Sequence, residues 1–540
     1  MDMPFCRICG AALDEGARFC RICGTPLEPN QPPIPQPQPS SENRQSNQLV
    51  SYRKPSNQTL SHFQLNERVV QYVVVPILLL AILAVKIWLA LQYRMQTWDA
   101  YSYLSNARTF YLLRPLDAYH FFEILRPPAF PFIISLVWRI TGESYAAAAV
   151  LNPIFAVGGA YVFFLLLKNM FGLKEGVVGS LLLMASLEVF VWTNQILVHG
   201  VGMFFMILSV YIFWLAIAGR GTYYFPLAGV ALALAALTRY TLAILIPVFP
   251  IMLLVLWFSS RAKSRTHFPW KSLGLMVLGF VLPWAPWLAW NYLNAGNPLA
   301  SVLAGAEFVS GNAEPWYFYI VNMPLLLTIP GSILLLVGLI DKKTLHDKGN
   351  LILFLWLTIF FAFSSIIQHK EARYLIDYAP PLVAFATLGV CRIESRLPSK
   401  TRMVAWILVA LWISAAFYPA FTSSLTDAND QSYGSDAFMA AAAWVDSNTN
   451  QTTIGISESP TAFSYQTDRL FYNLDLVNGI AQSEGISPDQ LMHEIGIRIA
   501  VVSADTAQDH SFHTDPNYAL VEQFSPYQIY MFNCQNCTKV

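Results

Sequence analysis

Charged and aromatic side chains are interspersed over residues 93–128, and this stretch is where the sequence can support chemistry. Asp99 lies there with Arg108 and Arg126 among many aromatic rings. A carboxylate can take a proton from an attacking nucleophile, and an arginine can bind a phosphate through two parallel hydrogen bonds. The stretch therefore suits a site for an amphipathic, anionic substrate. The alternative is an aromatic belt that only anchors a loop at a membrane surface.

A second chemical motif lies at the N-terminus, where four of the seven cysteines fall within the first 23 residues. Two Cys-x-x-Cys pairs separated by ten residues can place four thiolates around one tetrahedral zinc ion, with disulfides as the alternative. Four thiolates leave no open coordination position, so we expect structural zinc and a reducing, cytoplasmic location. The motif resembles the short zinc-ribbon family over residues 1–27, and a Pro-, Gln- and Ser-rich linker follows over 28–66. The predicted zinc ligands are Cys6, Cys9, Cys20 and Cys23.

The elements that must position the groups of 93–128 are membrane helices. The 540 residues are 55% hydrophobic and only 12% charged, which excludes a water-soluble globule. Apolar runs of about 16 to 24 residues, the length that crosses a bilayer, recur over 67–421. We therefore predict a mainly α-helical, polytopic membrane core. The eleven predicted spans are 70–92, 147–168, 175–192, 196–218, 222–238, 240–258, 270–292, 318–340, 350–367, 374–390 and 402–420.

The distribution of charge along the chain predicts its orientation. The formal net charge of zero argues against a nucleic-acid partner, but it is the sum of +1 over 1–66, +10 over 67–421 and −11 over 422–540. With the N-terminus inside, the loops expected in the cytoplasm carry most of the basic residues, as the positive-inside rule requires. This holds only if the short apolar segment 129–141 is a re-entrant or interfacial helix on the outer side. We therefore predict a multi-pass protein of the cell membrane with an extracytoplasmic C-terminal domain.

The membrane region also carries motifs that resemble those of GT-C glycosyltransferases, in particular the protein O-mannosyltransferase and lipid A aminoarabinose transferase group. Each match is weak alone, but their order and spacing extend over about 69–420. The resemblance implies transfer of a sugar from a polyprenyl-phosphate donor at the outer leaflet to a protein, lipid or glycan acceptor. The motifs are Trp98-Asp99-Ala100-Tyr101 with Tyr103, Ala107 and Arg108; Arg126-Pro127-Pro128-Ala129-Phe130-Pro131; Leu237-Thr238-Arg239-Tyr240 with Pro247; Pro286-Trp287 through Asn291 to Gly296-Asn297-Pro298; and Glu371-Ala372-Arg373-Tyr374-Leu375 with Pro380-Pro381.

The resemblance implies roles for individual residues. Asp99 is the expected general base, because the acceptor must lose a proton as it attacks the anomeric carbon. Arg126 and Arg373 are expected to hold the donor phosphate and to stabilise its charge as it leaves. The alternatives are a solvated loop acid for Asp99 and snorkelling side chains for the two arginines. The further expected substrate-binding residues are Tyr101, Arg108, Arg239, Lys370 and His199.

His199 marks a departure from the family pattern. Members often carry a second acidic residue in the loop after the third span, whereas 192–200 holds no acid and has His199 near the expected position. His199 can bind phosphate when protonated or accept a proton when neutral, and a polar helix cap is the alternative. Since paired carboxylates are the usual oxygen ligands of a divalent ion, we expect catalysis without a metal. Arg239 lies in a two-residue gap between apolar runs and is either functional or a loop tip that reaches water.

The acidic region 422–540 is expected to form a small α/β domain. Its hydrophobic patterns predict helices over 436–446 and 488–495 and strands over 453–457, 499–503 and 527–532.

The expected partners are the sugar donor, the lipid bilayer, an acceptor and a cytoplasmic protein that binds the zinc ribbon. A groove between 93–128 and the loop 293–317 is expected to admit the polyprenyl chain. A transporter or flippase of lipid-linked sugars and a receptor without catalysis are the alternatives. A transporter would show half-repeats around a midplane site, whereas the polar residues here concentrate in outer loops.

Overall fold

The computed structural model describes residues 66–114, 120–261, 267–308, 314–340, 347–432 and 434–532. The four cysteines of the predicted zinc ribbon and the predicted linker up to residue 65 lie outside the described residues. The chain divides into one unit over Met1–Gln64 and a second over Leu65–Val540, and every described element belongs to the second unit.

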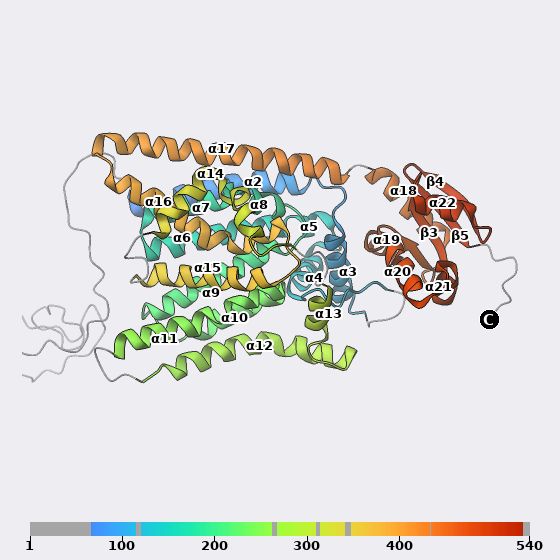
Figure 1. Ribbon diagram of the computed structural model, residues 1–540, viewed down its shortest axis with the longest axis horizontal. Coiled ribbons are helices and arrows are strands. Elements are labelled where there is room, and N and C mark those ends of the chain that lie inside the picture. The colour runs from blue at the N-terminus through green and yellow to red at the C-terminus, as the bar shows by residue number, and fades with distance from the viewer. Residues whose placement is uncertain are drawn as a thin grey trace, which may run out of the picture. The chain divides into compact units, whose positions relative to one another are not determined.

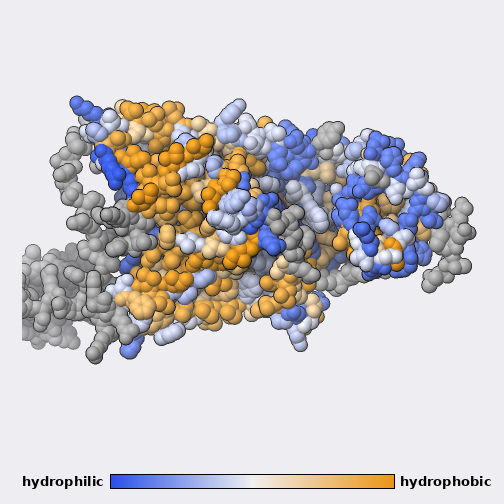
Figure 2. All heavy atoms as spheres, viewed as in Figure 1, coloured by the Kyte–Doolittle hydropathy of each residue, from blue (hydrophilic) through white to orange (hydrophobic). Residues whose placement is uncertain are grey.

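Within the described residues, nine helices are long and apolar enough to cross a membrane, and they coincide with nine of the eleven predicted spans. Figure 2 shows an apolar surface over the long helices and a hydrophilic surface over the C-terminal elements, as expected if lipid covers the former. The elements that build these nine segments are α1 (Glu67–Val69), η1 (Val70–Val74), α2 (Val75–Ala90), α5 (Tyr145–Ala149), α6 (Leu151–Met170), α9 (His199–Ile217), η2 (Tyr240–Leu245), α11 (Val248–Arg261), α12 (Trp270–Ala295), α14 (Phe318–Leu339), α15 (Lys348–Ile366), η3 (Ala372–Tyr378), α16 (Ala379–Arg396) and α17 (Ser399–Ser432).

The other two predicted spans, 175–192 and 222–238, form shorter helices. The first is divided into α7 (Leu173–Ala185) and α8 (Leu187–Trp192), because the extended backbone of Ser186 ends α7. The second is α10 (Tyr224–Thr238), which ends at the extended residue Arg239. Its 15 residues give a length of about 22 Å, less than the roughly 30 Å of a bilayer core. Both helices are largely buried among their neighbours.

Small residues allow the central helices to approach closely. α16 is almost entirely buried, with α14 packed along it. A Cβ atom on Gly389 would lie 2.0 Å from the carbonyl oxygen of Leu334, and one on Gly338 would lie even closer to that of Phe385. Larger residues at these positions would therefore separate the two helices.

Two short helices, α3 (Trp98–Leu112) and α4 (Ala129–Thr141), pack on each other at one end of the long helices, where α13 (Ala300–Phe308) also lies (Figure 1). α4 occupies the predicted interfacial segment 129–141 and is amphipathic. Its buried positions recur every four residues, and so do three exposed apolar side chains on the opposite face. The buried residues are Phe130, Ile134 and Trp138, and the exposed ones are Phe132, Leu136 and Ile140.

The C-terminal region has the α/β structure that its pattern predicts. Its five-stranded sheet has the order β2-β1-β3-β5-β4, with β1 parallel to β2 and β3 and with β5 antiparallel to β3 and β4. Every predicted helix and strand is confirmed within one or two residues, whereas α19, β2, α20, α22 and β4 were not predicted. The elements are α18 (Ser435–Asn448), β1 (Ile454–Ser457), α19 (Pro460–Thr467), β2 (Phe471–Asn473), α20 (Leu474–Glu484), α21 (Pro488–Ile495), β3 (Ile497–Ser503), α22 (Ala507–Thr514), β4 (Tyr518–Phe524) and β5 (Tyr527–Phe532).

The sheet and α3 share one hydrophobic core. Tyr101 and Leu104 of α3 belong to the same buried cluster as Phe438 of α18, Phe463 of α19 and Ile499 of β3. α17 runs without a break across residue 421, the predicted domain boundary. The C-terminal elements are therefore packed directly against the helix that begins at Trp98.

Candidate functional site

Asp99 lies in the first turn of α3 and connects two distant arginines. Its Oδ1 accepts a hydrogen bond from Arg126 Nη2 at 2.6 Å, and its Oδ2 accepts one from Arg373 Nη1 at 2.8 Å. The first turn of a helix favours a negative charge, since its unpaired N–H groups carry partial positive charge. The three residues proposed for the chemistry are therefore in direct contact.

Each arginine also holds a second carboxylate. Arg126 Nε donates to Glu123 Oε2 at 2.9 Å, and Arg373 Nη2 donates to Glu371 Oε1 at 2.9 Å. We call these five residues the Asp99 cluster. Its two guanidinium groups and three carboxylates give it a net charge of −1 when all are ionised. The carboxylates therefore compete with any anion that binds these arginines.

The arginines determine the protonation state of the cluster. Burial alone would raise the pKa of Asp99, but Arg126 and Arg373 hold that pKa below its ordinary value. Burial would likewise raise the pKa of Glu371, but its hydrogen bonds to Arg373 favour the ionised form, so that pKa is also lowered. Both carboxylates are therefore ionised near neutral pH. A carboxylate with a lowered pKa is a weak base for as long as both arginines remain on it.

Aromatic rings surround the guanidinium groups. The guanidinium carbon of Arg126 lies 5.4 Å from the ring centre of Tyr103, and that of Arg373 lies 5.7 Å from Trp192 and 5.5 Å from Tyr374. Rings at these distances attract the cations and limit the access of water to them. They come from α3, α8 and η3, so the cluster is enclosed by three separate elements.

A second buried ion pair adjoins the cluster. Arg239 Nη1 lies 3.0 Å from Asp377 Oδ2, and the guanidinium of Arg239 stacks over Tyr374 at 4.1 Å. The hydroxyl of Tyr374 donates to Glu371 at 2.8 Å, which joins this pair to the Asp99 cluster. Asp377 was not singled out from the sequence. The signal that could have found it is a lone acid within an apolar span, where a charge is costly unless it is paired.

The structure places two predicted substrate-binding residues of α3 outside the Asp99 cluster. Tyr101 is 1% exposed and packs against the rings of Phe438 and Tyr465. Arg108 donates to Glu143 at 2.5 and 2.8 Å and stacks over Tyr465 at 4.1 Å. These side chains hold α3 against the C-terminal elements and do not face Asp99.

Lys370 donates to backbone carbonyls, whereas His199 keeps, within the described part of the chain, an unpartnered nitrogen near the cluster. Lys370 is buried, and its Nζ donates to the backbone carbonyls of Glu314 and Ile367. His199 begins α9, is 5% exposed and has its ring 6.5 Å from that of Trp192. Its Nδ1 is buried and has no hydrogen-bond partner among the residues the structure describes. His199 thus keeps an unused polar atom close to Trp192, which contacts Arg373.

Metal ligands are not gathered in the described part of the chain. No group of three or more His, Cys, Asp or Glu side chains there could hold a metal ion. In the Asp99 cluster, guanidinium groups occupy the carboxylates. Cys6, Cys9, Cys20 and Cys23 lie outside the described residues, so the predicted zinc site is supported by its sequence alone.

Three family models match the chain. The zinc-ribbon domain matches residues 5–27, the dolichyl-phosphate-mannose-protein mannosyltransferase family matches 125–290, and the Alg9-like mannosyltransferase family matches 312–435. Arg126 and Arg239 lie in the second match and Arg373 in the third, whereas Asp99 precedes both.

A curated relative and two solved structures agree with these matches. The undecaprenyl phosphate-alpha-4-amino-4-deoxy-L-arabinose arabinosyl transferase 1 of Proteus mirabilis (strain HI4320) is 26% identical over 211 residues, which span 37% of this chain and 37% of that protein. The crystal structure of ArnT from Cupriavidus metallidurans bound to undecaprenyl phosphate has a TM-score of 0.65 at 13% identity, over 85% of this chain and 98% of that one. The Archaeoglobus fulgidus oligosaccharyltransferase in complex with Zn and sulfate has a TM-score of 0.51 at 14% identity, over 78% of this chain and 68% of that one.

These similarities define the class of the protein. The chain has the fold of the GT-C membrane glycosyltransferases, and the resemblance read from its motifs is confirmed. Its N-terminal segment matches a zinc-ribbon domain, which completes the predicted organisation of a zinc ribbon joined to a GT-C-like core.

Proposed function

We propose that the chain is a glycosyltransferase that moves a sugar from a polyprenyl-phosphate donor to an acceptor at the outer face of the cell membrane. One observation carries the proposal. Asp99 lies between Arg126 and Arg373, so a proton acceptor and two phosphate-binding groups meet at one point. The relatives support the donor class, since ArnT from Cupriavidus metallidurans binds undecaprenyl phosphate and the Proteus mirabilis relative is named for a sugar carried on it.

In this proposal, the donor phosphate displaces Asp99 from the two arginines. Each guanidinium has five N–H donors in a planar fork that matches phosphate oxygens. Glu123 and Glu371 keep the arginines in place while Asp99 is released. Once released, Asp99 loses the two cations that lower its pKa and becomes a stronger base. Donor binding thereby activates the base.

Sugar transfer then forms one bond and breaks one. An acceptor nucleophile attacks the anomeric carbon, and the bond between that carbon and the phosphate oxygen breaks. The proton of the nucleophile passes to Asp99, and polyprenyl phosphate leaves with its new charge held by Arg126 and Arg373. Arg239, which stacks over Tyr374, and His199, whose buried Nδ1 has no partner among the described residues, are further groups beside Arg373 that can bind the phosphate.

The remaining parts of the proposal concern orientation and zinc. The site faces outward because the positive-inside rule assigns the basic loops to the cytoplasm. Four thiolates at the spacing of Cys6, Cys9, Cys20 and Cys23 fit a structural zinc ion, which would fix the ribbon without taking part in transfer. A cytoplasmic ribbon would be available to a protein partner on that side.

The proposal is tested with the full chain purified into lipid nanodiscs. It is incubated with a panel of polyprenyl-phosphate hexoses and pentoses and a membrane extract as the source of acceptor. The measured product is free polyprenyl phosphate, which forms whatever the acceptor is. We expect turnover of at least one donor by the wild type and its loss in Asp99→Asn, with Asp436→Asn as the control because that side chain is 93% exposed. Movement of intact donor across a bilayer without release of polyprenyl phosphate would refute the proposal in favour of a flippase.

A further inference from the structure

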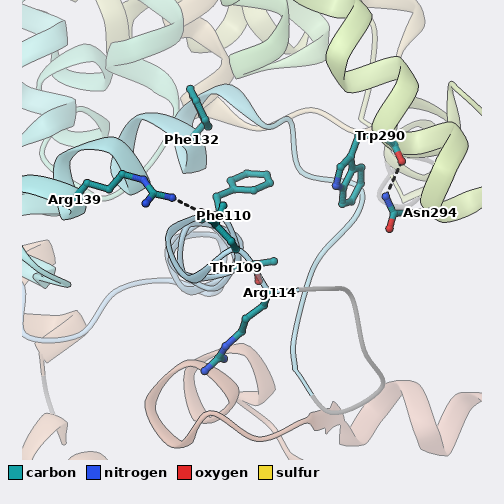
Figure 3. Close-up of a pocket in the computed structure, with 8 residues that line it drawn as sticks. Thr109, Phe110, Arg114, Phe132, Arg139, Trp290 and Asn294 are labelled. Atoms are coloured by element: carbon teal, nitrogen blue, oxygen red, sulfur yellow. Dashed lines mark hydrogen bonds between the residues drawn. The ribbon is translucent and has the colours of Figure 1, made fainter.

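A cavity of about 330 Å³ lies between the C-terminal end of α3, α4 and the C-terminal end of α12. Its apolar walls come from Phe110 of α3, Phe132 of α4, Trp290 of α12 and Leu113, which directly follows α3. Figure 3 shows Arg139 reaching toward Phe110 from α4, with Trp290 and Asn294 on the opposite side. The cavity is separate from the Asp99 cluster, because Phe110 follows Asp99 by eleven residues, or about 16 Å along α3.

Two of the four polar residues that line the cavity are cations. Arg114 and Arg139 line it, and no acidic side chain does so within the described residues. Arg114 is held by Asp468 through two hydrogen bonds of 2.7 and 2.8 Å. Arg139 is exposed, and its guanidinium makes one hydrogen bond among the described residues, from Nη2 to the carbonyl oxygen of Phe110 at 3.2 Å. An arginine has five N–H donors, so Arg139 has several left for an anion.

Aromatic residues around the cavity support a position at the depth of lipid headgroups. Trp290 lines the cavity near the C-terminal end of α12, and its ring stacks at 4.7 Å on that of Trp287, which is buried. Tryptophan is enriched where a membrane meets water. Phe132, which lines the cavity, begins the exposed apolar stripe of α4, so an acyl chain can follow the stripe while its headgroup lies at Arg139.

We propose that this cavity binds an anionic glycerophospholipid of the surrounding membrane, with the headgroup phosphate on Arg139 and an acyl chain along Phe132 and the stripe of α4. Charge complementarity favours an anionic over a zwitterionic lipid, because Arg139 has no carboxylate partner in the described chain. Its distance from Asp99 favours a resident phospholipid over the sugar donor, since a sugar held here would not reach the Asp99 carboxylate. Phospholipid bound here would contact α3, the helix that carries Asp99.

The test is native mass spectrometry of the full chain in detergent with equal amounts of phosphatidylglycerol and phosphatidylcholine. We expect the wild type to retain phosphatidylglycerol preferentially and Arg139→Gln to reduce that preference by about fivefold, which corresponds to about 1 kcal/mol for one arginine at an anionic surface. Arg139→Lys should keep part of the preference. The control Arg94→Gln removes an exposed arginine that pairs weakly with Asp436 at 3.5 Å and should change nothing.

Three results would overturn the proposal. The first is a wild type that retains both lipids equally, and the second is an Arg139→Gln variant that keeps the full preference. The third is displacement of phosphatidylglycerol by undecaprenyl phosphate in the wild type but not in Arg139→Gln, which would assign the cavity to the donor lipid. A matching thermal melting temperature for the wild type and Arg139→Gln shows that the variant is folded. None of these readouts depends on glycosyl transfer, so the proposal can fail while the proposed function stands.

Discussion

Replacement of Asp99 by Asn distinguishes a catalytic base from an acid that only positions arginines. Asn has nearly the same shape, and Arg126 and Arg373 keep their second partners, Glu123 and Glu371. The phosphate-binding groups should therefore stay in place. Removal of a general base lowers turnover by about 10² to 10⁴-fold, so we expect kcat to fall within that range.

Donor binding by Asp99→Asn should change in the opposite direction. The substitution takes the Asp99 cluster from a net charge of −1 to zero. Two unit charges about 5 Å apart at an effective dielectric of about 20 repel by roughly 3 kcal/mol, which sets an upper limit. Donor binding should thus range from unchanged to about 100-fold tighter, since 1.4 kcal/mol corresponds to a factor of ten.

The assay for Asp99→Asn combines release of polyprenyl phosphate with binding of a non-hydrolysable donor analogue in nanodiscs. Asp436→Asn serves as the control. Unchanged kcat would refute the role of Asp99 as base. Loss of turnover together with weaker donor binding would show that Asp99 acts by holding the arginines. A fall in the free energy of unfolding of about 1 to 3 kcal/mol is expected from the altered hydrogen bonds and leaves the fold intact.

Four further outcomes follow from the same geometry. Arg126→Gln should weaken donor binding by about 10- to 100-fold through loss of charge-assisted hydrogen bonds, whereas Arg94→Gln should not, as measured with the same analogue. Asp468→Asn should lower the free energy of unfolding by about 1 to 3 kcal/mol, as thermal melting can measure, because it loses a bidentate pair with Arg114, which follows α3 by two residues. Burial alone would raise the pKa of Asp99 and Asp468, but their arginine partners lower it. These ionised carboxylates therefore stabilise the fold above about pH 4, and that stabilisation is lost as the pH falls through their folded-state pKa values. Thermal melting between pH 7 and pH 3 should thus show a smaller loss of stability in the double variant Asp99→Asn, Asp468→Asn than in the wild type. Elemental analysis should find one zinc ion per chain and none in Cys20→Ser, while EDTA should leave release of polyprenyl phosphate unchanged.

Much of the fold could be predicted because it depends on local patterns. A run of about 20 apolar residues forms a membrane helix for reasons of length and hydrogen bonding alone, and nine of the eleven predicted spans are helices of that kind. The apolar run 499–503 and the alternation in 527–532 likewise predict the two strands that form β3 and β5. The break at Ser186 was not predicted, because no glycine or proline marks it in the sequence.

The candidate site depends more on contacts between distant residues. The sequence by itself predicted that Asp99, Arg126 and Arg373 take part in the chemistry, and the charge pattern predicted the same side of the membrane for them. Only the tertiary structure decided that Asp99 contacts Arg373 across 274 positions and that Arg239 pairs with Asp377 across 138. It also decided that Tyr101 packs inside the core, since the side of a helix that faces a neighbour depends on that neighbour. Residue types and hydrophobic periodicity are properties of short segments, whereas ion pairing in a buried site depends on how separate segments pack together.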